Sequence, residues 1–465
     1  MTSLPAETAY LFRHALLRDA ALQLHLPSAR ARMHALALEV IEGICGGRPP
    51  EEPAFRSHPT DPFAAEMAEH AEAAAAGGSP QPGDWPGIRR LYLRRGAEVA
   101  ELRYRFEEAV LLWRRSAEGG MPEAILEGFR RAAAALRSAG RLREAAELVR
   151  QGLASVPAGI GGGEEARARA LLGTILMELG ETAEAERTYT QALAGHRAAG
   201  DARSEAIARG NLGVLYRGSG RNAEAKAVYE QALGTWRALG LPRFEAIVLG
   251  DLAGLSQSEG RLDEAEALYR QALAIHREQR NRRSEGIALG NLSGLMQARG
   301  ELDAAVRLCE EALDVHREVG NRRSEGIALG RLAGIQADLG RFELAGNTFE
   351  RSLAIHRETG NRRAEGADLG YRAWIYLETG SRDRALLALD EALRIHRDVG
   401  NRRLEGCCLC DQALFRIGVE PAEAAAAWWA AGTKILRATG DRLELERKVA
   451  AMRSNCAKAG IAPFE

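Results

Sequence analysis

The chain has few aromatic residues and no long apolar run. Aromatic residues make up 5% of its 465 residues, so a folded interior must consist mainly of alanine, leucine, isoleucine and glycine. No stretch approaches the roughly 18 uninterrupted apolar residues typical of a membrane-spanning helix. The N-terminal MTSLPAETAY also lacks the basic and apolar regions of a signal peptide. We therefore expect a soluble, cytoplasmic protein with no membrane partner.

Neither the charge nor the cysteine content indicates a charged partner or a disulfide framework. The 63 basic and 64 acidic residues nearly cancel, so no overall field favours nucleic acid. Only four of the basic residues are lysines, and the strong use of arginine, alanine and glycine is typical of a GC-rich, bacterial genome. The six scattered cysteines follow no secreted disulfide spacing, which fits a reducing compartment.

What the chain does contain is a repeat of forty residues from residue 201 onward. One glycine column comprises Gly210, Gly250, Gly290, Gly330 and Gly370. A second glycine column comprises Gly220, Gly260, Gly300, Gly340 and Gly380. An alanine column comprises Ala225, Ala265, Ala305, Ala345, Ala385 and Ala425. A fixed period of this length is typical of a repeat architecture rather than of a compact enzyme.

Each repeat predicts two amphipathic helices. The first, such as RSEGIALGNLSGLMQAR, places apolar residues mostly three and four apart: Ile287, Leu289, Leu292, Leu295 and Met296. The second, such as LDEAEALYRQALAIHRE, has a similar stripe. In the later repeats a glycine ends this second helix, at Gly320, Gly360 and Gly400. Asn321, Asn361 and Asn401 are then expected to cap the next helix. Because one hairpin cannot bury its apolar stripe alone, the hairpins should stack into a solenoid.

These residues resemble the tetratricopeptide repeat. The resemblance rests on Leu252-Ala253, Gly260, Ala265, Tyr269 and Ala272-Leu273, with Tyr189 and Tyr229 in the aromatic position of earlier units. It implies an all-α, right-handed superhelical solenoid of antiparallel helix pairs. The period of forty exceeds the usual period of about 34, and the proline that usually ends the second helix is replaced by Arg277, Arg317, Arg357 and Arg397. The chain is similar in this respect to the longer repeats of bacterial signalling proteins and kinesin light chains.

The repeat pattern predicts four parts. Residues 161–440 form the array, residues 81–160 form degenerate repeat-like units, and residues 441–465 form a C-terminal capping helix and tail. Residues 1–80 form a helical N-terminal segment. Its pattern resembles a segment of bacterial STAND-class signalling ATPases that precedes a repeat array, carried by Phe12, His14, Leu16, Arg18, Asp19, Leu26, Pro27 and His34. The G-x-x-x-x-G-K-[ST] motif is absent from the sequence, so these residues either cap the array or provide a docking surface.

Two groups of residues resemble metal ligands. One histidine column comprises His196, His276, His316, His356 and His396. Each repeat has only one such histidine, whereas zinc needs three or four convergent ligands, so we expect these side chains to pack inside the array. Cys407, Cys408 and Cys410 lack a second CxxC pair and are expected to be small buried residues. No cofactor or metal is predicted.

In proteins with this repeat the first helix lines a concave groove, so its variable positions are candidate partner contacts. They are Asn211, Arg217, Asp251, Gln257, Asn291, Gln297, Arg331, Tyr371, Trp374 and Asp411. The paired glycines Gly250/Gly254, Gly290/Gly294 and Gly330/Gly334 lie on the same helices, where each costs about 0.5–1 kcal/mol relative to alanine. Either close helix packing or a smooth groove floor that a partner's backbone approaches would account for them.

The recurrent Asn-Arg-Arg places two cations in the first turn of a helix, where they oppose the helix dipole. Arg–Glu ladders through Glu285, Glu325, Glu365 and Glu405 would compensate, or the arginines would form a basic edge for an acidic peptide. The arginines of this possible edge are Arg282, Arg283, Arg322, Arg323, Arg362, Arg363, Arg402 and Arg403.

The sequence therefore predicts a non-catalytic scaffold or adaptor that binds a protein or an extended peptide. No catalytic residues are identified, because the serines, histidines and carboxylates form no recognisable site. One alternative is a ligand-sensing regulatory subunit whose effector, an ATPase, kinase or protease, lies on another chain. A self-assembling structural protein is the other, and self-association is compatible with a repeat array.

Overall fold

The computed structural model describes residues 25–51, 56–77, 84–439 and 442–464. Over these residues the chain is helical and has no strand. None of the described helices is long and apolar enough to cross a membrane. Two compact units are present, residues 1–135 and residues 136–465. Phe12, His14, Leu16, Arg18 and Asp19, on which much of the ATPase resemblance rests, lie outside the described residues.

The first unit is built from short helices rich in alanine. Its elements are α2 (Pro27–Ile44), η1 (Asp61–Phe63), α3 (Ala64–Ala76), α4 (Trp85–Leu102), α5 (Phe106–Ala117) and most of α6 (Pro122–Ser138). Helix α2 packs on α3 and α3 packs on α4. A buried ion pair joins Arg95 Nε to Asp61 Oδ1 at 2.7 Å, and Tyr92 Oη donates a hydrogen bond to Glu42 at 2.7 Å. These contacts fix α4 to the segments that precede it.

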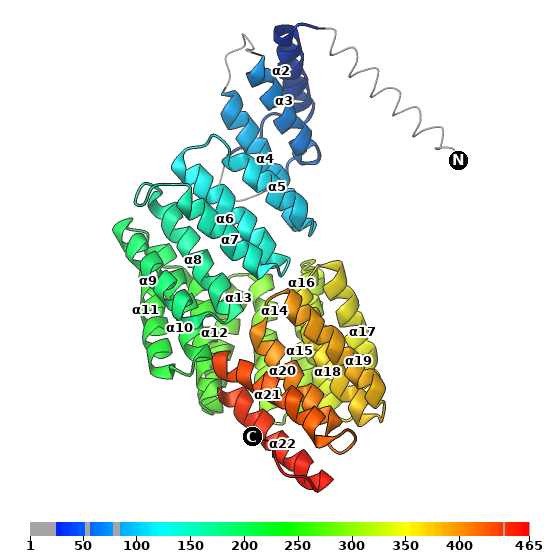
Figure 1. Cartoon of the computed structure of the whole chain (residues 1–465). Helices are drawn as coiled ribbons and strands as arrows, with labels where there is room; N and C mark the ends of the chain where they lie inside the picture. The colour runs from blue at the N-terminus through cyan, green and yellow to red at the C-terminus, as the bar shows by residue number, and fades with distance from the viewer. Residues whose placement is uncertain (1–24, 52–55, 78–83, 440–441, 465) are drawn as a thin grey trace, which may run out of the picture. The chain divides into compact units, whose positions relative to one another are not determined.

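The second unit is a stack of helical hairpins (Figure 1). Its helices are α7 (Leu142–Ala154), α8 (Gly162–Leu179), α9 (Thr182–Ala198), α10 (Ala202–Gly218), α11 (Asn222–Ala238), α12 (Pro242–Ser258), α13 (Leu262–Glu278), α14 (Arg282–Ala298), α15 (Leu302–Glu318), α16 (Arg322–Asp338), α17 (Phe342–Glu358), α18 (Arg362–Glu378), α19 (Arg382–Asp398), α20 (Arg402–Arg416), α21 (Ala422–Thr439) and α22 (Arg442–Ala459). From α8 to α21 each even-numbered helix pairs with the odd-numbered helix after it.

The turns between successive hairpins follow the predicted glycine and asparagine chemistry in most units. Gly320 has a φ of +65°, and Asn321 Oδ1 accepts a hydrogen bond from the Ser324 backbone N–H at 3.4 Å. Asn361 does not cap its helix as predicted, because its Oδ1 accepts a hydrogen bond from Arg323 Nη2 at 3.1 Å instead. Arg280 replaces the turn glycine and has a φ of +50°, a conformation that a residue with a Cβ adopts at an energetic cost.

The core between paired helices combines one large residue with small ones. The aromatic column includes Tyr189, Tyr229, Phe349 and Trp429, which are all fully buried. The ring of Tyr229 lies against Gly213, where an added Cβ would come within 2.5 Å of it. His316 lies in the same way against Gly286. Glycine at these positions is therefore explained by helix packing.

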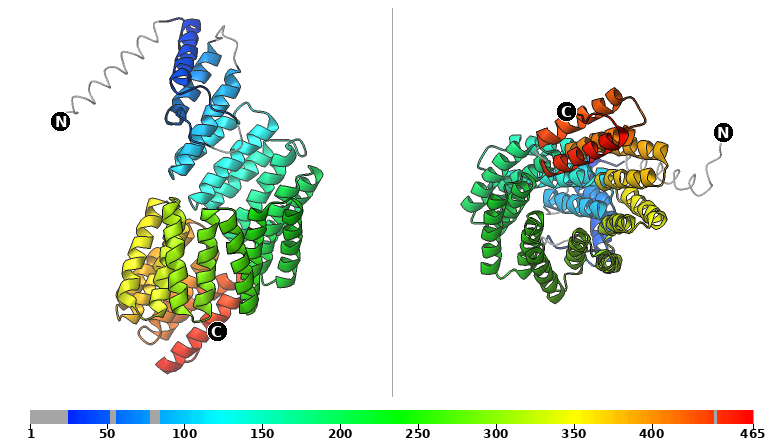
Figure 2. Two further views of the ribbon diagram at one scale, coloured as in Figure 1. Left: turned by 180° about the vertical axis from the view of Figure 1, so that it is seen from behind. Right: turned by 90° about the horizontal axis from the view of Figure 1, so that it is seen from below.

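The even-numbered helices form the inner side of the curved stack. Each of them from α8 to α18 also packs against the next even-numbered helix, as α10 does on α12 and α14 does on α16. In a curved stack the helices at smaller radius are closer together, so these helices line the concave face. The right panel of Figure 2 shows the hairpins of this unit, from green to orange, following each other along a curve. Arg323 Nη1 donates a hydrogen bond to the Ser138 carbonyl at 3.0 Å, so early and late helices of this unit meet.

Candidate partner-binding groove

The structure places the predicted groove residues on the even-numbered helices, from α10 to α20. Tyr371 is exposed and Asp411 is buried. The others are half-buried: Asn211, Arg217, Asp251, Gln257, Asn291, Gln297, Arg331 and Trp374. Some of these side chains reach across to a neighbouring even-numbered helix. Arg217 of α10 lies over Gly254 of α12, and Arg331 of α16 lies over Gly294 of α14. These residues therefore line one surface, which we call the groove.

Several glycines of the groove face open space. A Cβ added at Gly250, Gly290, Gly334 or Gly370 would meet no other atom within 4 Å, apart from the backbone of its own helix and its chain neighbours. Close helix packing therefore does not account for these four residues, although it does account for Gly213 and Gly286. An interior helix glycine destabilises a helix by about 0.5–1 kcal/mol relative to alanine. Their presence leaves the helix backbone of the groove accessible.

A column of exposed isoleucines runs beside these glycines. Ile207, Ile247, Ile287 and Ile327 occupy the same position in α10, α12, α14 and α16 and are 43%, 49%, 47% and 47% exposed. The sequence analysis placed Ile287 on the packed stripe of its helix, and this was wrong. Its neighbour Leu289 is fully buried, whereas Ile287 lies three residues before Gly290 and seven before Gly294, on the groove side. Exposed β-branched residues repeated in four units make the groove floor apolar.

The groove deepens into a pocket at Tyr371. A cavity of about 340 Å³ is lined by Phe342, Phe349, Tyr371, Trp374 and Ile375, with Asp338 and Glu378 at its polar side. The rings of Phe349 and Tyr371 stack with centroids 6.5 Å apart and an interplanar angle of 10°. Gln297 Nε2 donates a hydrogen bond to Asp338 at 2.6 Å, and both residues line the cavity. The pocket can hold one apolar side chain of a partner.

Trp374 also belongs to the core of the last repeats. Its ring packs edge-on against Phe415 with centroids 4.8 Å apart. Lys448 of α22 lies 6.0 Å from the centre of the Trp374 ring and pairs with Asp411 at 2.6 Å. The groove position at Asp411 is therefore filled from within the chain, by a helix that the sequence analysis assigned to capping.

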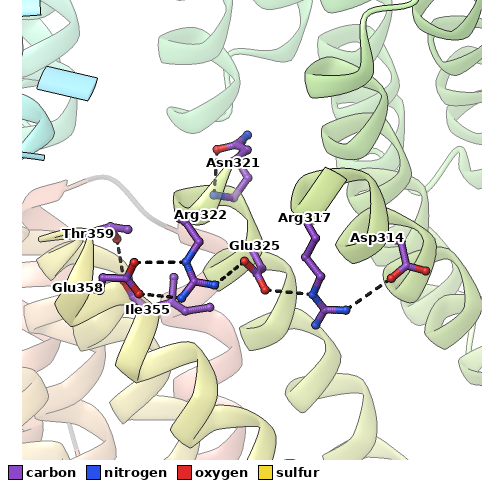
Figure 3. Close-up of polar contacts among 9 residues, drawn as sticks. Asp314, Arg317, Asn321, Arg322, Glu325, Ile355, Glu358 and Thr359 are labelled. Atoms are coloured by element: carbon purple, nitrogen blue, oxygen red, sulfur yellow. Dashed lines mark hydrogen bonds and ion pairs between the residues drawn. The ribbon is translucent and has the colours of Figure 1, made fainter. Parts of the chain in front are cut away.

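The predicted Arg–Glu ladders between neighbouring repeats are present (Figure 3). Glu325 accepts hydrogen bonds from Arg317 Nε at 3.0 Å and Arg322 Nη1 at 2.6 Å. Arg322 Nη2 then bonds to Glu358 of the next helix at 2.7 Å, and this contact lowers the pKa of Glu358. The first arginine of each Asn-Arg-Arg motif pairs with the glutamate three residues later: Arg282, Arg322, Arg362 and Arg402. Arg282 also bridges to Glu318 of the next helix, as Arg322 does to Glu358.

The second arginines have different surroundings. Arg283 and Arg403 are exposed. Arg323 bonds to Ser138, and Arg363 lies 3.5 Å from Glu178 of α8, where burial lowers the pKa of its guanidinium. Arg323 and Arg363 therefore help to join early and late helices of the second unit.

The histidine and cysteine columns are interior. His196, His276, His316, His356 and His396 are at most 3% exposed, and burial lowers the pKa of His396 to about 4. Cys407, Cys408 and Cys410 are buried as well, and burial raises the pKa of Cys407 and of Cys410 to about 12. Among the described residues no three His, Cys, Asp or Glu side chains are grouped to hold a metal ion.

Comparisons with known proteins agree with this architecture. A family model described as tetratricopeptide repeat matches residues 164–238, 244–318 and 324–398. A solved structure of a Rap protein complexed with competence and sporulation factor is 15% identical, covers 77% of this chain and 99% of that chain, and has a TM-score of 0.54. BtubC from P. vanneervenii is 22% identical and covers 51% of this chain and 92% of its own, with a TM-score of 0.37.

A search of curated proteins found no match. The family model spans α8 to α19, which are the hairpins that carry most of the groove. At 15% identity the Rap structure shows a shared fold and nothing finer. Residues 164–238, 244–318 and 324–398 are thus similar to tetratricopeptide repeats.

Proposed function

We propose that this chain is a non-catalytic scaffold that binds an extended segment of a protein or a peptide in the groove. The observation that carries the proposal is the row of open glycines, Gly250, Gly290, Gly334 and Gly370. These glycines weaken their helices, and no packing contact with another element requires a residue without a side chain at these positions. A partner's main chain that approaches the helix backbone closely is the physical reason we assign to them.

The rest of the groove supports the same proposal. The isoleucine column provides apolar contact along the groove, and the pocket at Tyr371 accepts a partner side chain. The odd-numbered helices, in contrast, present many charges that are already paired, as in Arg270–Glu266 and Arg317–Asp314. Exposed ion pairs of this kind contribute little to the specificity of a contact because water screens them. The groove is therefore the surface whose exposed apolar groups remain free to contact a partner.

The test is an affinity capture from the native cells with the wild-type chain and with Tyr371→Ala. Tyr371 is 65% exposed, so its removal should leave the fold intact. Loss of a central aromatic contact typically costs about 2 kcal/mol, which is roughly a thirtyfold loss of affinity. Leu387→Ala is the matched control, because Leu387 is 68% exposed on the odd-numbered helix α19. A partner that Tyr371→Ala retains at full affinity would contradict the assignment of the pocket.

A regulatory subunit is the second candidate, and one feature of the first unit favours it. Met33, Leu36, Val40 and Ile44 form a stripe on α2 and are 40%, 56%, 50% and 80% exposed. Helix α2 packs on α3 through its opposite, alanine-rich face, including Ala31 and Ala35. We propose this stripe as the surface that an effector would bind. Leu36→Asp would then release the effector and leave the groove partner bound.

A further inference from the structure

The cavity at Tyr371 combines aromatic rings with carboxylates. Phe342, Tyr371 and Trp374 line it, and Asp338 and Glu378 lie at its polar side. The two carboxylate side chains and the Tyr371 ring are exposed, so a partner can reach them. No lysine, arginine or histidine lines the cavity. Its wall therefore carries negative charge that no basic residue of the wall neutralises.

The two carboxylates of the cavity also lack ion-pair partners. Asp338 accepts a hydrogen bond from Gln297 Nε2 at 2.6 Å, and this amide is uncharged. Within the described part of the chain neither Asp338 nor Glu378 forms an ion pair. Glu325 and Glu365, in contrast, are each paired with two arginines. The chain thus neutralises the glutamates of its ladders internally but leaves the carboxylates of the cavity without a cation.

The helix ends at the cavity favour a positive charge as well. Asp338 and Glu378 are the last residues of α16 and α18, and neither helix has a basic residue in its last turn. The C-terminal end of a helix carries a partial negative charge, which attracts cations and disfavours carboxylates. Two carboxylates at two such ends therefore add to the same negative potential, and a cation bound in the cavity offsets it.

The rings and the carboxylates occur together in two adjoining repeats and not in the three repeats before them. In those earlier repeats the helix-end position of Asp338 and Glu378 is occupied by Gly218, Ser258 and Ala298. The position of Trp374 is a glycine in the three preceding repeats, at Gly254, Gly294 and Gly334. The cavity is therefore a local feature of the array and does not follow from the repeat pattern.

We propose that this cavity binds one cationic side chain of the partner segment, an arginine or a lysine. Both residues combine an apolar stem with a charged end. The stem lies against the rings, and the charged end meets Asp338 and Glu378. Cations of this kind are also attracted to the faces of aromatic rings. The inference rests on the proposed function of the groove and specifies the chemistry of its ligand.

The test starts from a random peptide library that is selected against the full wild-type chain and against Tyr371→Ala. The wild type is expected to enrich peptides with an arginine or a lysine at one fixed position, and Tyr371→Ala should not retain them. The enriched residue distinguishes arginine from lysine. Selected peptides are then synthesised with the cation and with a neutral replacement at that position, citrulline for arginine or acetyl-lysine for lysine.

Affinities are measured by fluorescence anisotropy, with circular dichroism to verify the fold. The neutral replacement should weaken binding to the wild type about tenfold, because the ion pairs and the contacts of the cation with the rings are lost. For the double variant Asp338→Asn/Glu378→Gln the same replacement should weaken binding only about two- to fivefold, because the rings alone still attract the cation. This variant should be at least as stable as the wild type, since it removes negative charge from two helix C-termini.

The matched control is the double variant Glu278→Gln/Asp398→Asn. Glu278 and Asp398 are exposed carboxylates at the last positions of the odd-numbered helices α13 and α19, and neither lines the cavity. The control removes the same number of charges from the same kind of helix end. It should bind every peptide as the wild type does.

Three results separate the two proposals. Peptides whose affinity depends on their cation, on Tyr371 and on the two carboxylates of the cavity support both. Peptides that are enriched but carry no cation, or that bind Asp338→Asn/Glu378→Gln as tightly as the wild type, overturn the cation site and leave the groove function standing. If the wild type enriches no peptide, the groove function fails for peptides and the cation site fails with it.

Discussion

Replacing Gly290 with alanine should stabilise the fold and weaken partner binding at the same time. Gly290 lies within α14, and an added Cβ would meet no atom of another element within 4 Å. The gain should be about 0.5–1 kcal/mol, from better helix propensity and a less flexible unfolded chain. Gly250→Ala and Gly370→Ala are equivalent changes in other repeats. Because distant sites add, the three together should give about 1.5–3 kcal/mol.

Gly286→Ala is the matched control in the same helix. Here the added Cβ would come within 2.5 Å of His316 Cε1, and His316 is only 3% exposed, so its ring has no room to move. Overpacking of this kind costs about 1–3 kcal/mol, which exceeds the gain in helix propensity. Two identical substitutions four residues apart should therefore change stability in opposite directions.

The measurement is the free energy of unfolding from urea titrations followed by circular dichroism. Each variant is compared with the wild type at equal m-value, because repeat arrays can depart from two-state unfolding. Partner affinity is measured on the same samples. If Gly290→Ala destabilises the protein, the space over Gly290 is filled and the assignment of an open floor is wrong. If it stabilises the protein and leaves affinity unchanged, the partner does not approach this backbone.

Three further results are expected. Stability should fall as the pH drops from 6.5 towards 4, because the unfolded His396 takes up a proton near 6.5 whereas its folded pKa is about 4; His396→Gln should flatten that slope in pH-dependent urea titrations. Glu365→Gln should cost about 1–3 kcal/mol, because this 1%-exposed carboxylate joins Arg357 to Arg362, whereas Glu358→Gln, at a 55%-exposed side chain, should cost less than about 1 kcal/mol. Arg280→Gly should stabilise by about 1 kcal/mol in thermal or urea unfolding, because it removes a side chain from a residue with a φ of +50°.

The period and the helix pairs could be predicted from the sequence because they depend on local chemistry. Glycine with positive φ ends the hairpins, as at Gly320, and small or aromatic residues recur at fixed positions in each stripe. The Arg–Glu ladders were predictable for the same reason, since Arg322 and Glu325 are one helical turn apart. The exception at Asn361 was not, because the competing donor, Arg323, comes from the previous repeat.

The sequence could predict which residues lie in the groove, but not the surroundings of each of them. The positions of Asp251 and Asp411 in the repeat are equivalent, so the sequence assigns both the same role. Their surroundings differ because α22 follows α20 and places Lys448 against Asp411. Ile287 and Leu289 were likewise placed in one apolar stripe, but residues two apart point to opposite sides of a helix, so Leu289 is buried and Ile287 is exposed.

These differences have a common physical origin that bears on function. A residue of a repeat is satisfied by its neighbours in the preceding and following units, so identical positions become distinct only where a neighbour changes. Among the described residues none forms an ion pair with Asp251 as Lys448 does with Asp411, and none fills the space over Gly290. Under the proposed function, such unsatisfied positions are the places where a partner would supply the missing contacts. The four open glycines lie on α12, α14, α16 and α18, and this row is the path that we propose for a single extended ligand.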